Sequence, residues 1–219
     1  GEFGQFILTG SSVPAALDES MHTGTGRIVR MQMRPMSLFE SKDSTGQVSL
    51  MDLFNKKDIS AVDNHSIDEI AFLICLGGWP AALNHGKKVA LKQAFDYYDA
   101  VVNDDISRVD RVKRDSERTK RILKSYARNV ATQVSLETIR SDVISNDVET
   151  FDKEALYGYL NALKRIFVIE DSPAWNPNLR SKTAIRTSNT RYFVDPSIAV
   201  AALGLGPTDL VNNLELMGL

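Results

Sequence analysis

Cysteine is nearly missing from this chain, which has one among 219 residues and so cannot form a disulfide within itself. That residue, Cys75, lies in the apolar run Phe72–Leu76, where a thiol usually packs in a core rather than acting as a nucleophile. A chain without a disulfide framework is typical of a reducing compartment, and we therefore expect a cytoplasmic protein.

Long apolar runs and an excess of charge are also lacking. No run approaches the roughly 20 apolar residues that a membrane helix needs, and the sequence shows no secretory signal. We therefore expect no contact with a membrane. The net charge is −2, with 43% hydrophobic and 25% charged residues. This composition is typical of a globular protein of one or two domains.

Several catalytic motifs are absent as well. The phosphate-binding motif Gly-x-x-x-x-Gly-Lys-Ser/Thr does not occur, and neither does the acidic strand end that would hold Mg²⁺. No nuclease-type Asp…Glu-x-Lys arrangement follows a predicted strand, and no Ser, His and Asp residues form a recognisable catalytic set. His22, His65 and His85 are scattered without metal-ligand spacing. We therefore expect no metal site, and no ATP hydrolysis by this chain alone.

The amino-terminal part contains two apolar segments that end in polar residues. Residues 6–12 (FILTGSS) end in hydroxyl side chains, and Ile28–Met33 precedes Arg34 and Pro35. We predict a buried strand in each segment. Ser37 and Glu40 follow with the spacing of a helix-capping box. Two strands do not make a parallel sheet, so we interpret this stretch as the severed edge of an α/β domain.

The remainder of the chain has mainly helical patterns. Residues 42–65 are polar and predict an exposed connection with one helical turn. Apolar spacing and capping residues then predict the following helices and strands. The helices are expected at about 67–76, 86–107, 116–133, 135–145, 152–165, 196–203 and 207–216, and the strands at 166–169 and 191–194. The predicted class is mainly α with small β elements (α+β), and three helices before a β-ribbon indicate a winged-helix-like domain.

Six sequence blocks together resemble one family. They are TGSSVPA (9–15), HTGTGRI (22–28), MRPMSLFES (33–41), Gly77–Pro80, Ala174–Arg180 and Arg191–Ser197. The chain resembles the bacterial predicted ATPases of the AAA+ superfamily that carry an uncharacterised carboxyl-terminal domain. The resemblance implies the end of an ATPase core over 1–40, a helical lid over 41–109 and the winged-helix-like start of the carboxyl-terminal domain over 110–219.

The same resemblance implies roles for residues near the amino end. Thr9 and Ser11 would be sensors near the γ-phosphate, and Arg27 would be an arginine finger acting on a neighbouring subunit. The alternatives are hydroxyls that cap a strand end and a surface arginine. The intact parent would bind ATP and Mg²⁺ with its missing amino-terminal ATPase half, and self-association would follow from the finger. No cofactor is expected for this chain alone. Trp79 would either pack in the lid or hold an adenine.

The carboxyl-terminal half carries the basic residues that could bind duplex DNA. Residues 108–128 contain nine Lys or Arg against three acids, and phosphate backbones attract such patches. Residues 135–154 oppose this reading with six acids. A protein-interaction adaptor is therefore the alternative. The candidate DNA-binding residues are Lys120, Lys124, Lys164, Arg165, Arg180, Lys182 and Arg186.

Overall fold

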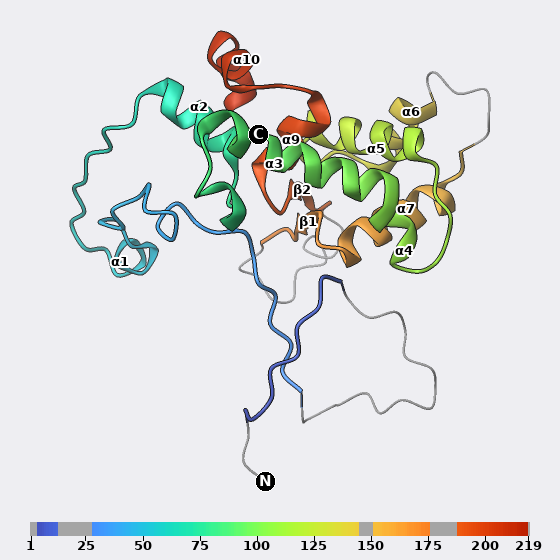
Figure 1. Cartoon of the computed structure of the whole chain (residues 1–219), viewed down its shortest axis with the longest axis horizontal. Coiled ribbons are helices and arrows are strands. Elements are labelled where there is room, and N and C mark those ends of the chain that lie inside the picture. The colour runs from blue at the N-terminus through green and yellow to red at the C-terminus, as the bar shows by residue number, and fades with distance from the viewer. Residues whose placement is uncertain (1–3, 13–27, 145–150, 176–187, 219) are drawn as a thin grey trace. The chain divides into compact units, whose positions relative to one another are not determined.

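The computed structural model describes residues 4–12, 28–144, 151–175 and 188–218. They are mainly helical with a small two-stranded sheet, which confirms the predicted α+β class (Figure 1). The chain divides into two compact units, and each is made of two separate stretches. Unit 1 comprises residues 1–32 and 99–194, and unit 2 comprises residues 33–98 and 195–219.

The two amino-terminal segments differ from the prediction. Residues 5–10 and 28–37 are neither helix nor strand. Phe6, Ile7 and Leu8 are almost fully exposed, between 87% and 89%. A strand is stabilised by pairing and by burial of its side chains, and the described residues provide neither for these segments. The prediction of buried strands here is therefore wrong for the structure described.

The first predicted capping box forms without a helix after it. Ser37 Oγ accepts a hydrogen bond from the Glu40 N–H, and a Glu40 carboxylate oxygen accepts from the Ser37 N–H. The chain then turns through residues 38–42, and Lys42 has a φ of 70°. A left-handed residue ends a helical turn, which explains why the box is followed by a turn.

Unit 2 is helical and surrounds a small core. Its elements are α1 (Leu50–Phe54), α2 (Ile67–Leu76), the 3₁₀ turn Pro80–Ala82, α3 (Lys87–Ala100, mostly in this unit), α9 (Pro196–Leu203), α10 (Pro207–Asn212) and the 3₁₀ turn Leu214–Gly218. Ala71, Cys75, Val200 and Leu210 form the core cluster. This confirms that Cys75 packs in a core. Burial raises the pKa of the Cys75 thiol to about 11, so it carries little thiolate at neutral pH.

The helix boundaries of unit 2 follow local sequence. Ser66 and Glu69 form the predicted capping box at the start of α2, and Gly77 ends that helix with a φ of 68°. The helix predicted over 86–107 is also confirmed. It runs as α3, a π-helical turn Val101–Asp105 and α4 (Ile106–Arg108), and the last two belong to unit 1. These boundaries needed only capping residues and apolar spacing.

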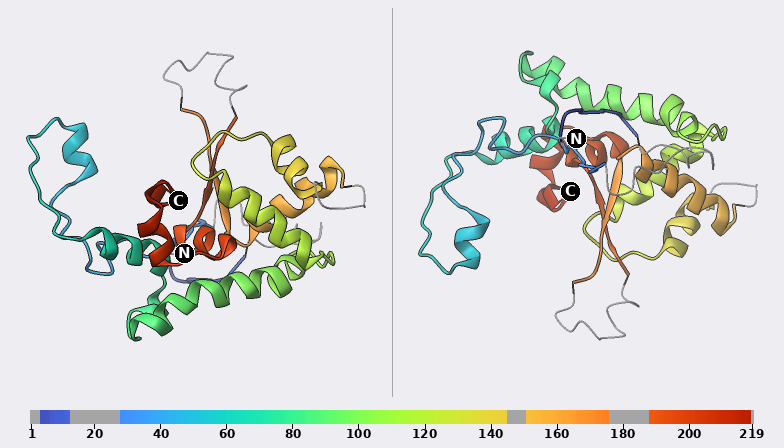
Figure 2. Two further views of the ribbon diagram at one scale, coloured as in Figure 1. Left: turned by 90° about the horizontal axis from the view of Figure 1, so that it is seen from above. Right: turned by 90° about the horizontal axis from the view of Figure 1, so that it is seen from below.

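Among its described residues, the rest of unit 1 contains three helices and a β-hairpin. The elements are α5 (Ser116–Arg128), α6 (Leu136–Ile144), α7 (Lys153–Arg165), β1 (Ile169–Ser172) and β2 (Thr190–Phe193). Asp152 caps α7 as predicted, accepting a hydrogen bond from the Ala155 N–H. The strands are antiparallel, with Ile169 opposite Phe193 and Ser172 opposite Thr190 (Figure 2).

Two boundaries in unit 1 differ from the predictions. Helix α5 ends at Arg128, earlier than 133, because Ala131 and Thr132 pair with β2 instead. The Ala131 N–H donates to the Arg191 carbonyl at 2.8 Å, and the Arg191 N–H donates to the Thr132 carbonyl at 2.9 Å. Strand β1 begins at Ile169 rather than 166, since the N–H groups of residues 166–168 donate to carbonyls in the last turn of α7. Residues 166–168, the apolar run before β1, therefore terminate α7 at its carboxyl-terminal end rather than forming part of a strand.

Candidate functional site

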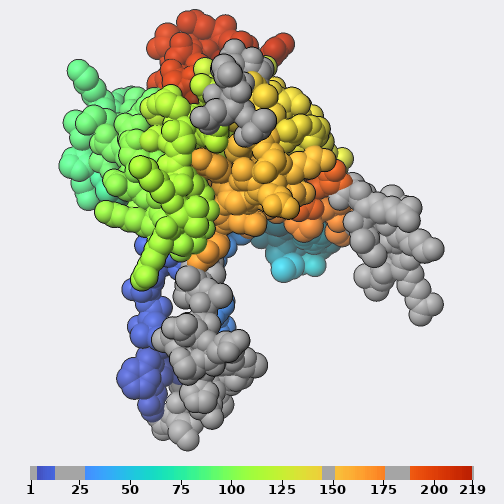
Figure 3. Space-filling model, turned by 90° about the vertical axis from the view of Figure 1, so that its right-hand side faces the viewer, coloured from blue at the N-terminus to red at the C-terminus, as the bar shows by residue number. Residues whose placement is uncertain are grey.

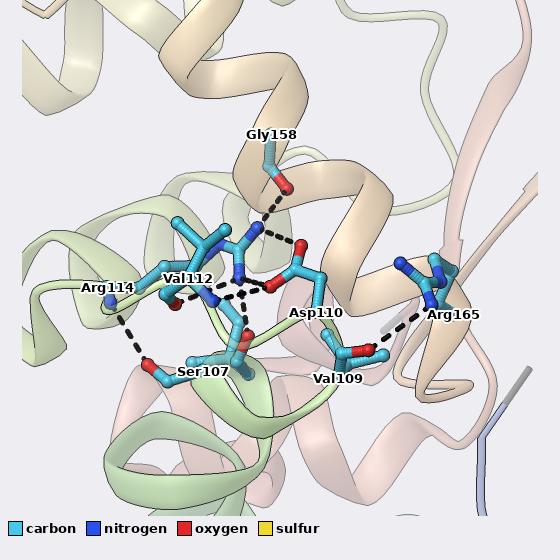
Figure 4. A network of polar contacts seen from close by, with 8 residues as sticks. Ser107, Val109, Asp110, Val112, Arg114, Gly158 and Arg165 are labelled. Atoms are coloured by element: carbon cyan, nitrogen blue, oxygen red, sulfur yellow. Dashed lines mark hydrogen bonds and ion pairs between the residues drawn. The ribbon is translucent and has the colours of Figure 1, made fainter. Parts of the chain in front are cut away.

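An arginine at the centre of the basic run is buried inside unit 1. The Arg114 side chain is 5% exposed and forms two hydrogen bonds of 2.7 Å with the Asp110 carboxylate. It also donates to the Ile106 carbonyl at 2.7 Å and to the Gly158 carbonyl of α7 at 3.2 Å (Figure 4). The bonds from Arg114 lower the pKa of Asp110. Arg114 therefore joins α7 to the connecting segment that precedes α5. Its charge is paired with Asp110 inside unit 1.

Other basic residues, in this run and on α7, are also engaged. Arg118 lies over the Phe151 ring at 5.4 Å from its centroid, and Lys120 donates to Glu117 at 2.8 Å. Arg165 donates to the Val109 carbonyl at 3.2 Å. Lys124 is exposed. Five of the nine basic residues in 108–128 lie on α5, and two of them, Arg118 and Lys120, make these contacts within unit 1.

A buried carboxylate joins the hairpin to α5 and α7. Asp171 is 5% exposed. Its Oδ1 accepts a hydrogen bond from the Tyr126 hydroxyl, and its Oδ2 accepts from Lys164 Nζ and an Arg191 guanidinium nitrogen, each at 2.7 Å. Burial alone would raise the pKa of Asp171, but the bonds from Lys164 and Tyr126 outweigh it and hold the pKa below its ordinary value. This cluster fixes β1 and β2 against the helices.

Helix α7 presents one exposed polar face. Leu156, Tyr159, Leu160 and Leu163 are buried, whereas the opposite side of the helix is exposed. Figure 3 views unit 1 from a side on which residues 151–172, in orange, lie at the surface. The exposed residues of α7 are Lys153, Glu154, Tyr157, Asn161 and Lys164. Lys164 is the candidate DNA-binding residue on this face, and it forms an ion pair with Asp171.

The corner after α2 is held by the start of α9 in unit 2. Asp195 accepts a hydrogen bond from the Gly78 N–H at 2.8 Å and also bonds the N–H and hydroxyl of Ser197. Ser197 Oγ accepts from the Trp79 indole N–H at 2.9 Å. The Trp79 ring packs on Tyr97 with centroids 4.6 Å apart. The indole thus makes packing contacts in unit 2, and adenine binding by Trp79 stays a prediction.

The remaining predicted residues are not brought together by the described structure. Thr9 and Ser11 are exposed on the segment without strand partners. Arg27, Arg180, Lys182 and Arg186 lie outside the described residues. Among the residues that are described, no group of three His, Cys, Asp or Glu side chains could hold a metal ion. Within the same ranges, no helix has both the length and the apolar character needed to cross a membrane.

Two residues with central positions were not among the predicted site residues. Asp171 joins three donors from different elements, and no local pattern in the sequence marks it. Arg114 was counted as part of a basic patch, and its spacing of four from Asp110 was the available signal for an ion pair. A pair at this spacing is expected on a helix surface, whereas these two lie in a connection.

Comparison with known proteins gives one match. Residues 67–209 match the model of the family described as Domain of unknown function (DUF8612), which includes α2, α7, both strands and α9. No curated protein and no solved structure matches the chain.

Proposed function

This chain belongs to the family described as Domain of unknown function (DUF8612), and we propose that its unit 1 is a winged-helix-type module that binds duplex DNA. The observation that carries the proposal is the pairing of Ala131 and Thr132 with Arg191. It adds a short strand-like segment between α5 and α6 to the β1–β2 hairpin. The resulting order of helix, strand, helix, helix and hairpin supports a winged helix, in which the third helix faces the major groove.

Helix α7 is the third helix in this order and would be the recognition helix. Tyr157 and Asn161 lie on its exposed face, and an amide side chain can read the edge of an adenine in the major groove. Lys153 and Lys164 on the same face would contact phosphates. Glu154 in the first turn suits the helix dipole, and it limits how closely that end approaches the backbone.

We name the sequence between β1 and β2 the wing sequence and propose that its basic residues contact phosphates. The sequence between Pro173 and Thr190 contains Arg180, Lys182 and Arg186 and no acidic residue. A segment of that charge neutralises phosphates and releases counterions on binding. The acids of residues 135–154 favour the protein-interaction alternative, but this segment without acids and the exposed cations of α7 make duplex DNA the partner that we favour.

Replacing the three wing cations is expected to weaken duplex binding and reduce its salt dependence. The triple variant Arg180→Gln, Lys182→Gln, Arg186→Gln would be titrated with a labelled duplex of about 20 base pairs, roughly two helical turns, using fluorescence anisotropy. The slope of log K against log salt should fall by about 2–3, since each phosphate contact contributes about 0.9.

A matched variant in unit 2 controls for net charge. Lys42→Gln, Lys56→Gln, Lys88→Gln removes the same three charges from exposed positions, and its duplex binding should resemble that of the unsubstituted chain. If the unsubstituted chain does not raise the fluorescence anisotropy of the labelled duplex even at about 50 mM salt, where phosphate contacts are strongest, the DNA-binding proposal fails. Equal losses in the two triple variants would also contradict it.

A second function is favoured by a different observation, the exposed apolar side chains of the amino-terminal segments. Phe6, Ile7 and Leu8 are exposed in one segment, and Val29 and Met31 in the other. Exposed apolar extended segments are suited to pairing with the strands of another sheet. We propose that they join the sheet of a P-loop ATPase domain that itself holds ATP and Mg²⁺. The described residues alone do not fit a nucleotide, because Thr9 and Ser11 lie exposed and no phosphate-binding loop accompanies them.

This second proposal predicts nucleotide binding only in a longer polypeptide. Calorimetric titration with ATP and Mg²⁺ should give no heat of binding with this chain. The same titration should show binding to a form extended at its amino end by about 150–200 residues of its reading frame, on the scale of one domain. Absence of binding to the extended form would rule the ATPase proposal out and would leave the DNA-binding proposal unaffected.

A further inference from the structure

We propose that Trp175 and Tyr192, two exposed aromatic residues of the β1–β2 hairpin, stack on unpaired bases. The preferred ligand of unit 1 would then be duplex DNA with a single-stranded extension rather than an uninterrupted duplex. This inference rests on the proposed DNA-binding function and narrows it to a class of substrate. It concerns a stacking surface that is separate from the α7 face described above.

The two rings belong to the same hairpin and are exposed to different degrees. Trp175 is 86% exposed and follows the end of β1 at Ser172 by three residues. Tyr192 lies in β2, opposite Glu170, and is 40% exposed. Their strand neighbours Phe193 and Ile169 are buried. The hairpin therefore has one side in the core and carries exposed aromatic rings elsewhere.

The other tryptophan of the chain has a structural role, and its exposure and contacts can be compared with those of Trp175. Trp79 is partly buried, its N–H is bonded to Ser197 and its ring packs on Tyr97. Trp175 is far more exposed than this, although the indole is among the largest apolar surfaces that a side chain can bury. A large ring at this exposure is available to a ligand.

The surroundings favour a base over an apolar protein groove. Polar residues lie along the hairpin beside these rings. Ser172 is exposed, and Glu170, which is opposite Tyr192, and Thr190 are partly buried. Aromatic anchors in protein interfaces are instead ringed by contacts that exclude water. The sequence that follows Trp175 is basic, as noted above, and single-stranded nucleic acid is bound by a combination of basic charge and aromatic stacking.

The test uses tryptophan emission and three DNA ligands. The ligands are a blunt duplex of about 20 base pairs, the same duplex with an extension of about 10 nucleotides, and the extension strand alone, a length within one single-strand site. Emission of the unsubstituted chain minus that of Trp175→Phe reports Trp175. The extended duplex should quench this signal and bind about tenfold more tightly than the blunt duplex, as expected for stacking of one or two bases.

Substitution of the rings separates stacking from backbone contacts. The double variant Trp175→Ala, Tyr192→Ala should bind the blunt and extended duplexes with equal affinity, whereas Trp175→Phe should keep part of the preference. Phe54→Ala, which removes an exposed ring from α1 in unit 2, should leave the preference intact. Duplex binding with no preference for the extension, or with unchanged Trp175 emission, would overturn this inference and leave the DNA-binding function standing. No binding of any ligand would overturn both.

Discussion

Replacing Gly77 with alanine is expected to lower the free energy of unfolding of unit 2 by about 4 kcal/mol, the sum of backbone strain and steric crowding. Gly77 has φ 68° and ψ −179°, a combination that is essentially restricted to glycine. Any other residue there costs about 1–3 kcal/mol. The loss should be visible as a lower urea midpoint for the unfolding of unit 2.

Crowding adds to this strain. A Cβ at Gly77 would lie within 3.0 Å of Asp195 Oδ1, Ser197 Oγ and the Trp79 indole nitrogen. Asp195 and Ser197 are buried and hydrogen-bonded to each other, so they have little room to move aside. Overpacking of this kind costs about another 1–3 kcal/mol. The effect is therefore expected to exceed that of a typical point substitution.

Gly204→Ala is the matched control for Gly77→Ala. Gly204 ends α9 with a φ of 70°, but no atom lies within 4 Å of the position of its Cβ. Only the left-handed backbone is then penalised, by about 1–2 kcal/mol. Urea unfolding would be followed by Trp79 emission in a Trp175→Phe background, which leaves one tryptophan and reports unit 2 alone. Equal losses for Gly77→Ala and Gly204→Ala would show that crowding has no effect.

Replacing Asp171 with alanine is expected to destabilise unit 1 by about 3–5 kcal/mol, because removing one partner leaves a buried charge without compensation. The Arg191 side chain is 10% exposed and would lose its carboxylate, and the Tyr126 hydroxyl would lose its acceptor. Lys164 is more exposed and can be solvated by water. Hydrogen exchange of the amides in α5 and α7 would measure the loss, since it reports opening of unit 1 by itself.

The stabilisation by Asp171 should depend on pH in a defined direction. Its pKa in the folded protein is lowered from an unfolded value of about 3.9. The contribution is therefore fully present well above the unfolded pKa and is lost as the pH falls through the folded pKa. Unit 1 of the unsubstituted chain should lose more stability between about pH 5 and pH 2 than Asp171→Ala does.

Tyr126→Phe serves as the control for this prediction. It removes the hydrogen bond that an uncharged donor makes to the Asp171 carboxylate, and it keeps both cations paired. The cost should be about 1–2 kcal/mol, as for a single buried hydrogen bond, and the acid sensitivity should remain. An Asp171→Ala variant as stable as Tyr126→Phe, or with the acid sensitivity of the unsubstituted chain, would contradict the assigned role.

Helix positions were predictable from sequence because their signals are local. Ser66 with Glu69, and Asp152 before α7, satisfy helix N–H groups within three residues. Pro196 and Gly204 bracket α9 in the same way. These interactions form within one turn, so a reading of neighbouring residues is sufficient.

Strands were predicted less well because a strand is defined by its partner. The apolar segment 6–8 was predicted as a buried strand and lies exposed, since no described residues pair with it. The apolar run at 166–168 ends α7, and β1 begins at Ile169. The sequence showed that these segments are apolar, but not what they pack against.

The sequence by itself determined the α+β class, the helix caps, the core position of Cys75 and the presence of a basic run over residues 108–128. Only the tertiary structure decided which charges are available. Arg114 is buried on Asp110 and Gly158, and Arg191 is held by Asp171. A count of charges cannot separate a buried ion pair from an exposed cation, because burial of a pair depends on contacts with residues distant in the chain, such as Gly158 for Arg114 and Asp171 for Arg191. The same long-range contacts joined Ala131 and Thr132 to β2, and that pairing supports the proposed DNA-binding module.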